Sequence, residues 1–224
     1  MAKELNSYNK VLDYDSKYKF TEAWFDHFAQ LWDKILPHTN CKFENSLEIG
    51  CYEGRASIWL ANNHLKPGSN YTVLDAFGGT AIEKGMERTV NNLEDNTNFI
   101  EDNFRHNISF HKDINWQIIK GYSQIELPKL LKNNEEPIYD FIYIDGSHQA
   151  DDTFVDGYYA NKLLKPGGLL IFDDYGWGLE DVKEKGNNWP PKHGIDTFLF
   201  LYEKEYQNII PGQYQTYLYK KPPA

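Results

Sequence analysis

The stretch FIYIDGSHQADD, residues 141–152, decides the fold. Its first four residues are apolar or aromatic, which is typical of a strand buried on both faces of a parallel sheet. The strand ends at Asp145, and a helix is expected at 150–164. A buried strand that leads directly into a helix is the repeating unit of α/β folds. Asp145 and His148 therefore fall at the carboxyl end of a strand, where such sheets bind ligands.

The same alternation of strands and helices continues along the chain. Strands are expected at residues 46–50, 71–77, 116–123, 137–145 and 169–175, and helices at 21–36, 55–65, 98–108, 124–132, 150–164 and 195–206. The first helix has Thr21 as its expected N-cap. Residues 213–221 alternate in polarity and predict an antiparallel strand at the edge of the sheet. We therefore predict an α/β fold with a mostly parallel sheet and helices on both faces.

Length and composition predict one soluble domain. The 224 residues divide into an N-terminal helical extension at 1–40, packed on the core, and a main domain at 41–224. A net charge of -10 argues against a nucleic acid as partner. Two cysteines without metal or disulfide spacing indicate a reducing compartment. No signal peptide or membrane-spanning run is present, so we expect a cytoplasmic protein without membrane contact. Assembly into a homo-oligomer stays an open alternative.

The ends of the first three strands carry residues suited to a nucleotide-like ligand. Gly50 and Gly54 form a G-x-x-x-G turn before a helix, where a ligand can approach the backbone, unless the glycines only allow a tight turn. Asp75 can accept both hydroxyls of a ribose, or else it lies in solvent. Ser123 and Gln124 can read the edge of an adenine, although Ser123 could equally cap the following helix.

Three acids at the ends of the fourth and fifth strands predict a cation site. Asp145 ends one strand, and Asp173 and Asp174 end the next. Two such charges about 4 Å apart repel by roughly 4 kcal/mol at an effective dielectric constant of 20. A proton, a basic side chain or a cation has to offset that repulsion, and a divalent ion with oxygen ligands, commonly Mg²⁺, fits. The alternative is that one acid points into solvent and another caps the next helix.

His148 follows Asp145 by three residues and so is expected over the same end of the sheet. An ordinary pKa of about 6.5 suits a histidine there to the role of general base. The alternative is a surface histidine at the start of a helix. The aromatic loop 175–194 carries Trp177 and Trp189, which either close over an acceptor or seal the edge of the core.

The segments SLEIGCYEGRASIWL, YTVLDAF, KGYSQ, FIYIDGSHQADD and LLKPGGLLIFDDYGW together resemble class I S-adenosylmethionine-dependent methyltransferases. The most similar branch is that of the macrocin-type sugar O-methyltransferases, which are distantly related to catechol O-methyltransferase. The resemblance runs from about residue 20 to the C-terminus. It implies a Rossmann-like methyltransferase fold with a seven-stranded, mostly parallel sheet whose last strand is antiparallel.

The resemblance also implies roles for individual residues. The residues expected to line the methionine end of S-adenosylmethionine are Glu48, Gly50, Tyr52 and Gly54. Asp75 is expected to hold the ribose, and Ser123 and Gln124 are expected to contact the adenine. The residues expected to bind Mg²⁺ are Asp145, Asp173 and Asp174. Asp145 is counted with the cofactor-binding residues as well. The catechol enzymes carry a catalytic lysine where this chain has His148, so the base differs in identity. They also carry a serine near the cofactor carboxylate where this chain has Ala56, and Ser57 is the candidate substitute.

Together these observations predict an S-adenosylmethionine-dependent methyltransferase. Its acceptor is expected to be a hydroxyl of a small molecule, a sugar or a diol, activated with the help of a divalent ion. His148 and Asp145 are the candidate catalytic residues. The alternatives are a metal-independent N- or carboxyl-methyltransferase and a catalytically silent subunit that binds the cofactor. A nicotinamide-dependent oxidoreductase is disfavoured because the G-x-G-x-x-G pattern is absent.

Overall fold

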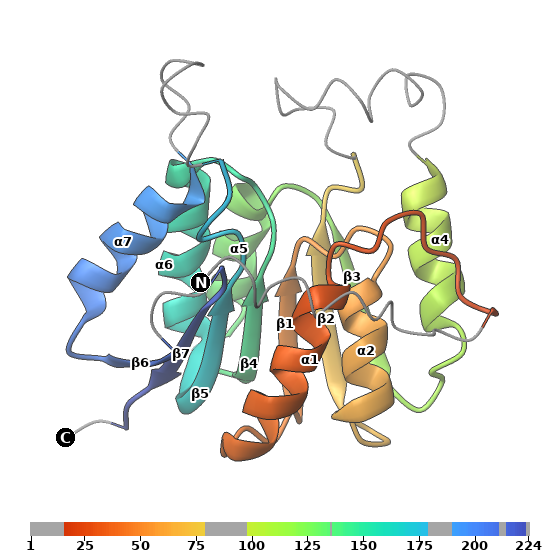
Figure 1. Cartoon of the computed structure of the whole chain (residues 1–224), viewed down its shortest axis with the longest axis horizontal. Coiled ribbons are helices and arrows are strands. Elements are labelled where there is room, and N and C mark those ends of the chain that lie inside the picture. The colour runs from red at the N-terminus through yellow and green to blue at the C-terminus, as the bar shows by residue number, and fades with distance from the viewer. Residues whose placement is uncertain (1–15, 79–97, 135, 179–189, 211–213, 223–224) are drawn as a thin grey trace, which may run out of the picture.

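The computed structural model describes residues 16–78, 98–134, 136–178, 190–210 and 214–222 (Figure 1). Its helices are α1 (Asp26–Ile35), the 3-10 helix η2 (Leu36–His38), α2 (Arg55–Asn63), α4 (Asn98–Ile108), α5 (Ser123–Lys132), α6 (Ala150–Leu163) and α7 (Pro191–Tyr202). Its strands are β1 (Asn45–Ile49), β2 (Asn70–Asp75), β3 (Asn115–Lys120), β4 (Tyr139–Ile144), β5 (Leu164–Phe172), β6 (Tyr206–Ile210) and β7 (Thr216–Lys220). Within these ranges no helix has the length and apolarity that a membrane crossing requires.

The described strands form one seven-stranded sheet in the order β3-β2-β1-β4-β5-β7-β6. Strands β1 to β5 pair in parallel, and β7 is antiparallel to both β5 and β6. The predicted Rossmann-like α/β fold with a mostly parallel sheet and an antiparallel last strand is confirmed. Because the parallel strands run in one direction, their carboxyl ends share one edge of the sheet (Figure 1).

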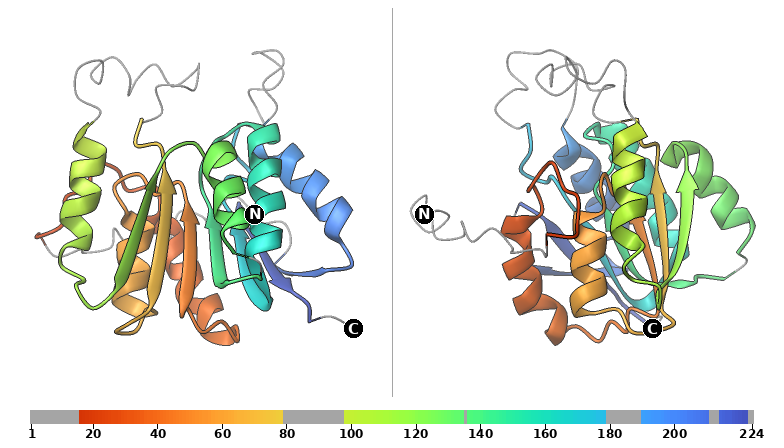
Figure 2. Two further views of the ribbon diagram at one scale, coloured as in Figure 1. Left: turned by 180° about the vertical axis from the view of Figure 1, so that it is seen from behind. Right: turned by 90° about the vertical axis from the view of Figure 1, so that its right-hand side faces the viewer.

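Helices cover both faces of the sheet, and each face has its own apolar core (Figure 2). One core packs α1, α2 and α4 against the sheet, and the other packs α5, α6 and α7. Residues of β4 alternate between the two: Phe141 and Tyr143 belong to the first core, and Ile142 and Ile144 belong to the second. Side chains alternate along a strand, so Asp145 faces the side of α1 and α2.

The first helix begins later than predicted, and Thr21 is not its N-cap. Helix α1 starts at Asp26 after Phe25, which makes no side-chain cap hydrogen bond. The backbone N–H of Thr21 instead donates to Oε2 of Glu53, 2.6 Å away. This bond holds the chain against the turn between β1 and α2, so the helix begins only after that turn has been passed. The division of the chain at residue 40 stays a prediction.

The other edge of the sheet also differs from the prediction. Helix α7 ends at Tyr202, and an unpredicted strand, β6, begins at Tyr206. The Tyr206 ring is buried, and its hydroxyl donates to Oδ1 of Asn161 over 2.8 Å. Because β6 forms the edge, β7 lies inside the sheet between β5 and β6, and its predicted edge position is wrong.

Candidate active site

The carboxyl ends of β1, β4 and β5 bring three predicted site residues into one row. Backbone hydrogen bonds continue one residue beyond the strands. The Asp145 N–H donates to the last carbonyl of β1, and the Asp173 N–H donates to the last carbonyl of β4, both over 2.8 Å. The Gly50 N–H donates over 2.9 Å to the carbonyl of Leu74 in β2. Gly50, Asp145 and Asp173 therefore lie side by side at the edge where such sheets bind ligands.

The two glycines of the β1–α2 turn are required by close packing. Gly50 has a φ of +81°, and a Cβ on it would lie 2.0 Å from the carbonyl oxygen of Asp145. Gly54 has a φ of +80°, and a Cβ there would lie 2.7 Å from the ring of Phe104. No residue with a side chain fits either position without a shift of its surroundings. Contact of these glycines with a cofactor stays a prediction.

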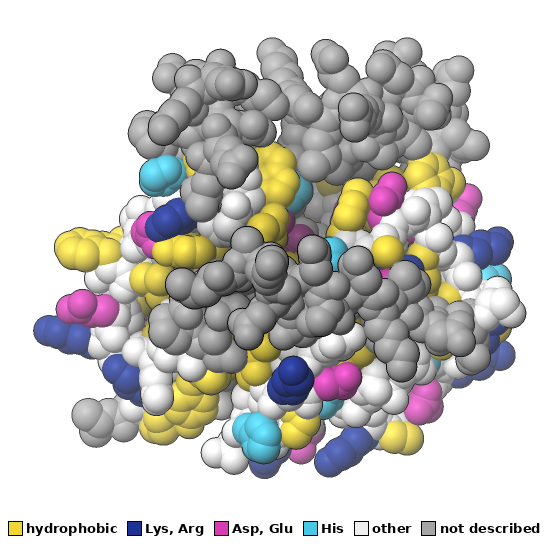
Figure 3. Space-filling model, viewed as in Figure 1, with side chains coloured by type: hydrophobic (Ala, Val, Ile, Leu, Met, Phe, Trp, Pro, Cys, Tyr) yellow, Lys and Arg dark blue, Asp and Glu magenta, His cyan; other side chains and the backbone are white. Residues whose placement is uncertain are grey.

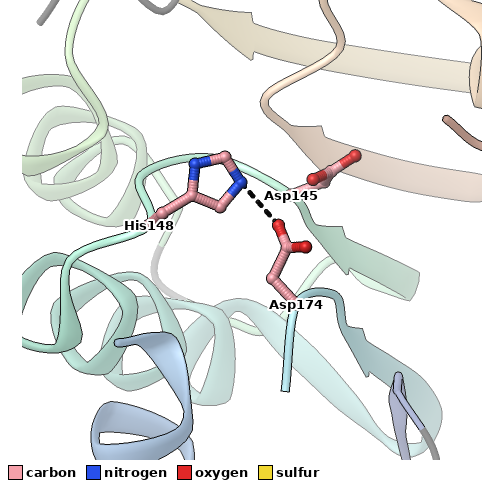
Figure 4. A group of neighbouring side chains, drawn as sticks. All are labelled: Asp145, His148 and Asp174. Carbon is pink, nitrogen blue, oxygen red and sulfur yellow. Dashed lines mark ion pairs between the residues drawn. The ribbon is translucent and has the colours of Figure 1, made fainter. Parts of the chain in front are cut away.

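Asp145, His148 and Asp174 meet at the centre of this edge (Figure 4). Each of the three offers one ligand atom, and these atoms all lie within 4.8 Å of one another. His148 comes from the loop between β4 and α6, and its Nε2 lies 2.6 Å from Oδ2 of Asp174, which follows β5. The side chains of this pair are 17% and 15% exposed, so they stay accessible to a small ligand.

Local backbone and ring contacts fix the pair of His148 and Asp174. Asp174 has a φ of +58°, in the left-handed region that is uncommon for residues other than glycine and tolerated best by Asp and Asn. This turn directs its carboxylate toward His148 rather than alongside Asp173. On its other side the imidazole stacks on the ring of Trp177, with 4.5 Å between centroids and 21° between planes. Trp177 is therefore part of the site, whereas Trp189 lies outside the described residues.

Asp173 points away from this group of three and into the protein. Its Oδ1 accepts from the Asp174 N–H over 2.7 Å, and its Oδ2 accepts from the Gln215 amide over 2.8 Å and from the Tyr143 hydroxyl. Burial, and then the charge of Asp174, raises the pKa of Asp173 to about 7, against the two side-chain hydrogen bonds. Of the three acids expected to hold a cation, the structure brings Asp145 and Asp174 together and places Asp173 behind them.

The support of Asp173 is a buried polar network that the sequence reasoning missed. Gln215 precedes β7, and its Oε1 accepts from Nε1 of Trp32 over 2.8 Å and from the Tyr217 hydroxyl. The Tyr143 hydroxyl lies 3.2 Å from Oδ2 of Asp145 as well. One signal was present in the sequence: Tyr143 stands two residues before Asp145 on one strand, so both side chains had to share a face.

The electrostatics of Asp145 favour a bound cation. Burial raises the pKa of this carboxyl well above its ordinary value, and the charges of Asp173 and Asp174 add to the rise, while His148 opposes it. Ionised together, the three acids repel one another at short range. Two carboxylate oxygens and one imidazole nitrogen are ligands for a hard or borderline divalent ion such as Mg²⁺ or Mn²⁺. The residues present therefore fit the predicted cation.

Asp75 holds the turn that follows β1. Its Oδ2 accepts from the backbone N–H groups of Cys51 and Tyr52 over 2.7 and 2.9 Å, and its Oδ1 accepts from that of Phe77 over 2.6 Å. An ionised carboxylate offers about four acceptor positions, so about one remains for a hydroxyl of a ligand. Its predicted contact with a ribose stays a prediction.

The segment that leads to the predicted adenine residues starts beside Asp75. Ser123 and Gln124 begin helix α5 directly after β3, and both side chains are half-buried. The Gly121 N–H donates over 3.0 Å to the carbonyl of Asp75, which places the start of this turn beside the end of β2. The cap position of α5 belongs to Tyr122 and has no side-chain hydrogen bond, so capping does not explain Ser123.

Glu48 is a core residue in this structure. It is 1% exposed, and its Oε2 accepts from the Tyr71 hydroxyl over 2.8 Å and from the Ser57 hydroxyl. Burial raises its pKa from the ordinary 4.5 to about 7, and the two hydroxyls reduce the rise. Ser57, the candidate substitute for the serine of the catechol enzymes, therefore donates to Glu48. The other predicted neighbour of the methionine end, Tyr52, packs its ring 5.1 Å from that of Trp24.

The raised pKa of Glu48 predicts a pH dependence of stability. The Glu48 carboxyl keeps its proton up to about pH 7 in the folded protein but only up to about pH 4.5 in the unfolded chain. The contribution of Glu48 to the free energy of unfolding is therefore fully present below pH 4.5 and is lost as the pH rises to 7. Glu48→Gln keeps both hydrogen bonds and is expected to raise the unfolding free energy above pH 7 by about 3 kcal/mol. Urea unfolding between pH 4 and 8 measures the effect, with exposed Glu44→Gln as control; parallel pH curves for Glu48→Gln and the parent contradict it.

The face over the strand ends is partly apolar. In the space-filling view, hydrophobic side chains border a hollow above α1, and an acidic side chain is visible inside it (Figure 3). Trp24 is 47% exposed and Tyr214 is 40% exposed. The ring of Tyr214 lies 5.6 Å from that of Phe28 in α1. Acidic groups at the centre and aromatic rings around them suit a small, partly apolar molecule with a polar reacting group.

Comparison with known families gives one match along the core of the sheet. Residues 47–175 match a family model described as a methyltransferase domain. That range runs from β1 to Tyr175, just past β5, and so includes every residue of the group Asp145, His148 and Asp174.

Individual relatives are more distant. The chain is 25% identical over 176 residues to "Probable caffeoyl-CoA O-methyltransferase 3" of Dictyostelium discoideum, which covers 78% of this chain and 59% of that protein. The chain thus spans less than two thirds of the length of this curated relative. It is similar to the O-methyltransferase from Bacillus cereus solved in complex with SAH, with a TM-score of 0.58, 20% identity, and coverage of 97% and 90%.

A second solved structure is similar at lower coverage. The methyltransferase MycE of the mycinamycin biosynthetic pathway, solved in complex with Mg, SAH and mycinamycin VI, gives a TM-score of 0.51 with 14% identity. The match covers 92% of this chain and 51% of MycE. At these identities the solved structures show a shared fold.

Proposed function

Because the chain belongs to the family of methyltransferase domains, we propose that it transfers a methyl group from S-adenosylmethionine to a hydroxyl oxygen of a small molecule. The observation that carries the proposal is the group of Asp145, His148 and Asp174 at the carboxyl ends of β4 and β5. It lies one strand away from Gly50 and two from Asp75, the residues proposed for the methyl donor. An acid–base group beside the donor is what an oxygen acceptor requires, because a neutral hydroxyl is a weak nucleophile.

Asp145 and Asp174 are the proposed ligands of a divalent cation, with Asp173 supporting Asp174 from behind. When bound, such an ion lowers the pKa of an acceptor hydroxyl and fixes its direction. MycE, which shares the fold, was solved with Mg and SAH, and this supports a divalent ion in the proposed function. Asp173 contributes in another way, since its Oδ1 accepts from the Asp174 N–H and so holds the left-handed turn.

His148 is the proposed general base. The carboxylate of Asp174 holds one ring nitrogen at 2.6 Å, and the stacked ring of Trp177 fixes the plane of the imidazole. An acid that orients a histidine in this way also stabilises its protonated form. The rest of the task is alignment, because a near-attack pose of two bound reactants can supply roughly 7–11 kcal/mol.

The acceptor is proposed to be a sugar hydroxyl or a vicinal diol. The descriptions of relatives name different small molecules: one is described as a probable caffeoyl-CoA O-methyltransferase, and MycE was solved in complex with mycinamycin VI. Both aromatic and sugar-bearing acceptors suit the exposed rings around the site. A screen of nucleotide-sugars and polyphenols with methyl-labelled S-adenosylmethionine would identify the acceptor. Failure of S-adenosylhomocysteine to bind in calorimetry, or tighter binding of NAD, would overturn the proposed function.

Asp75→Ala is expected to raise the Kd of S-adenosylhomocysteine by at least tenfold. The variant loses the acceptor for a ribose hydroxyl and also the three N–H contacts that hold the β1–α2 turn. Isothermal titration calorimetry measures the effect, with Asp113→Asn, an exposed change before β3, as control. A Kd within twofold of the parent value speaks against a role of Asp75 in cofactor binding.

A further inference from the structure

The segment 17–25, which leads into α1, is attached to the turn between β1 and α2. It runs from α1 past α2 to α4 (Figure 1). The backbone N–H of Thr21 donates to Oε2 of Glu53 in that turn over 2.6 Å. Asp26, at the start of α1, accepts from Nε and Nη2 of Arg55 at the start of α2, both over 2.6 Å. A residue inside the turn and a residue directly after it therefore bind the chain that precedes α1.

Asn107, in the last turn of α4, fastens the other end of this segment. Its Oδ1 accepts from the Lys19 N–H over 2.7 Å, and its Nδ2 donates to the Lys19 carbonyl over 2.8 Å. The same Nδ2 donates to the carbonyl of Glu53 over 2.9 Å. The side chain of Asn107 is fully buried, and both of its N–H donors are used in these bonds. One amide thus joins the segment to the β1–α2 turn.

The docked segment also supplies a donor to a buried carboxylate. Glu53 is 1% exposed, and its Oε1 accepts from Nδ2 of Asn103 over 2.8 Å. Its Oε2 accepts from the Thr21 N–H of the segment. A buried carboxylate that lacks hydrogen-bond donors is costly in free energy. When the segment leaves, Glu53 loses one donor and has to turn toward water, so the β1–α2 turn that carries it changes as well.

This turn carries the residues proposed for the methionine end of the methyl donor. From the side of β2 it is held by Asp75, which accepts from the N–H groups of Cys51 and Tyr52. From the other side it is held by α4 and by the segment 17–25, through Asn107 and Glu53. The conformation that a cofactor meets at the turn therefore depends on whether the segment is docked.

We propose that Asn107 is a positioning residue for S-adenosylmethionine, which docks the segment 17–25 on the β1–α2 turn, so that the docked segment and the bound cofactor stabilise one another. The inference rests on the proposed function, because that function places the methionine end of the cofactor at this turn. Coupling between two equilibria is reciprocal. If undocking raises the Kd of the cofactor by some factor, saturation with the cofactor favours docking by the same factor.

Hydrogen exchange of the parent protein tests this coupling without a mutation. The N–H groups of Lys19 and Thr21 donate in the docked segment, so their exchange reports on docking. Saturating S-adenosylhomocysteine is expected to slow their exchange by about tenfold. Mass spectrometry of peptides that span 17–25 measures the effect, and peptides that span 50–57 report on binding at the turn. Unchanged exchange in the segment together with slowed exchange at the turn overturns the inference.

Asn107→Ala is expected to raise the Kd of S-adenosylhomocysteine by about tenfold and to speed exchange of the segment by a similar factor. The reason is the loss of the bonds to Lys19 and Glu53. Titration calorimetry measures the Kd. Asn103→Ala is the matched control on the same helix, because it removes a bond to Glu53 and keeps those of Asn107 to the segment. Its Kd should stay within threefold of the parent value, and its segment should stay protected.

An equal rise of the Kd in both variants, with the segment still protected in Asn103→Ala, contradicts a role of docking. A purely structural role of Asn107 predicts a lower thermal midpoint with a Kd within twofold of the parent value, and that result also overturns the inference. In turnover assays the KM for S-adenosylmethionine should rise in Asn107→Ala while kcat stays within threefold, because uniform binding is lost. A fall in kcat at unchanged KM counts against the inference.

The outcomes separate this inference from the proposed function. If S-adenosylhomocysteine does not bind to the parent protein, the proposed function fails and the inference fails with it. If it binds to the parent and the exchange of the segment 17–25 does not respond, the proposed function stands and the role of Asn107 is removed. Should Asn107→Ala not fold, the exchange of the parent protein with and without S-adenosylhomocysteine decides by itself.

Discussion

Asp145→Asn is expected to lower kcat by about 10²–10³, which corresponds to about 3–4 kcal/mol of transition-state stabilisation. The variant keeps the size of the side chain and the contact with the Tyr143 hydroxyl but loses the charge. A neutral amide oxygen is a poorer ligand for a hard divalent ion than a carboxylate. The acceptor hydroxyl would then be neither acidified nor held in line with the methyl group. Steady-state assays with methyl-labelled S-adenosylmethionine measure the loss.

The loss of activity in Asp145→Asn should not be accompanied by a loss of stability. Burial and two neighbouring carboxylates raise the pKa of Asp145, so the ionised carboxylate destabilises the protein without a cation. Removing that charge is expected to leave the thermal midpoint unchanged or higher at pH 8, while activity falls. Exposed Asp151→Asn, in the first turn of α6, is the control and should change neither quantity. Near-parental kcat in Asp145→Asn would exclude this carboxylate from the reaction.

His148→Ala is expected to lower kcat by about 10²–10⁴, the usual contribution of a general base. The Kd of S-adenosylhomocysteine should stay within threefold, because the imidazole contacts Asp174 and Trp177 and its removal leaves the proposed donor residues Gly50 and Asp75 in place. The Mn²⁺ affinity then distinguishes two roles. A base leaves it nearly unchanged, whereas a nitrogen ligand of the ion raises the Kd strongly when it is removed.

The matched control for His148 is His38→Ala, an exposed histidine in the 3-10 helix η2. It should leave both kcat and Mn²⁺ affinity unchanged. If His148→Ala retains the parental kcat over the whole pH range, the imidazole is neither base nor ligand. In that case the pair with Asp174 and the stacking on Trp177 would have a structural role.

The sheet and the row of strand ends were predictable because they follow from local patterns. Apolar runs that end on Gly50, Asp145 and Asp173 predict parallel strands, and parallel strands necessarily place those ends at one edge. The same reasoning brought His148 over Asp145, which the structure confirms. The carboxylate row could thus be inferred before any coordinates, since it depends only on strand direction and on the position at which each run stops.

The different positions of Asp173, inside the protein, and Asp174, beside His148, could not be predicted from the sequence. Two adjacent acids look equivalent in a pattern, and their roles separate only through the left-handed backbone of Asp174 and the buried partners of Asp173. Those partners include Gln215 from the segment before β7, more than 40 residues away along the chain. Helix α1 begins later than predicted, because the backbone before it is bonded to Glu53, a residue distant in the sequence.

The central claim is that Asp145 and Asp174 hold one divalent ion beside the methyl donor. The most direct test is a crystal structure of the protein grown with S-adenosylhomocysteine and Mn²⁺, in which anomalous scattering locates the ion. The account predicts a single strong peak between the two carboxylates, next to the sulfur of the bound product. A complete site for S-adenosylhomocysteine with no anomalous peak between those carboxylates would contradict it.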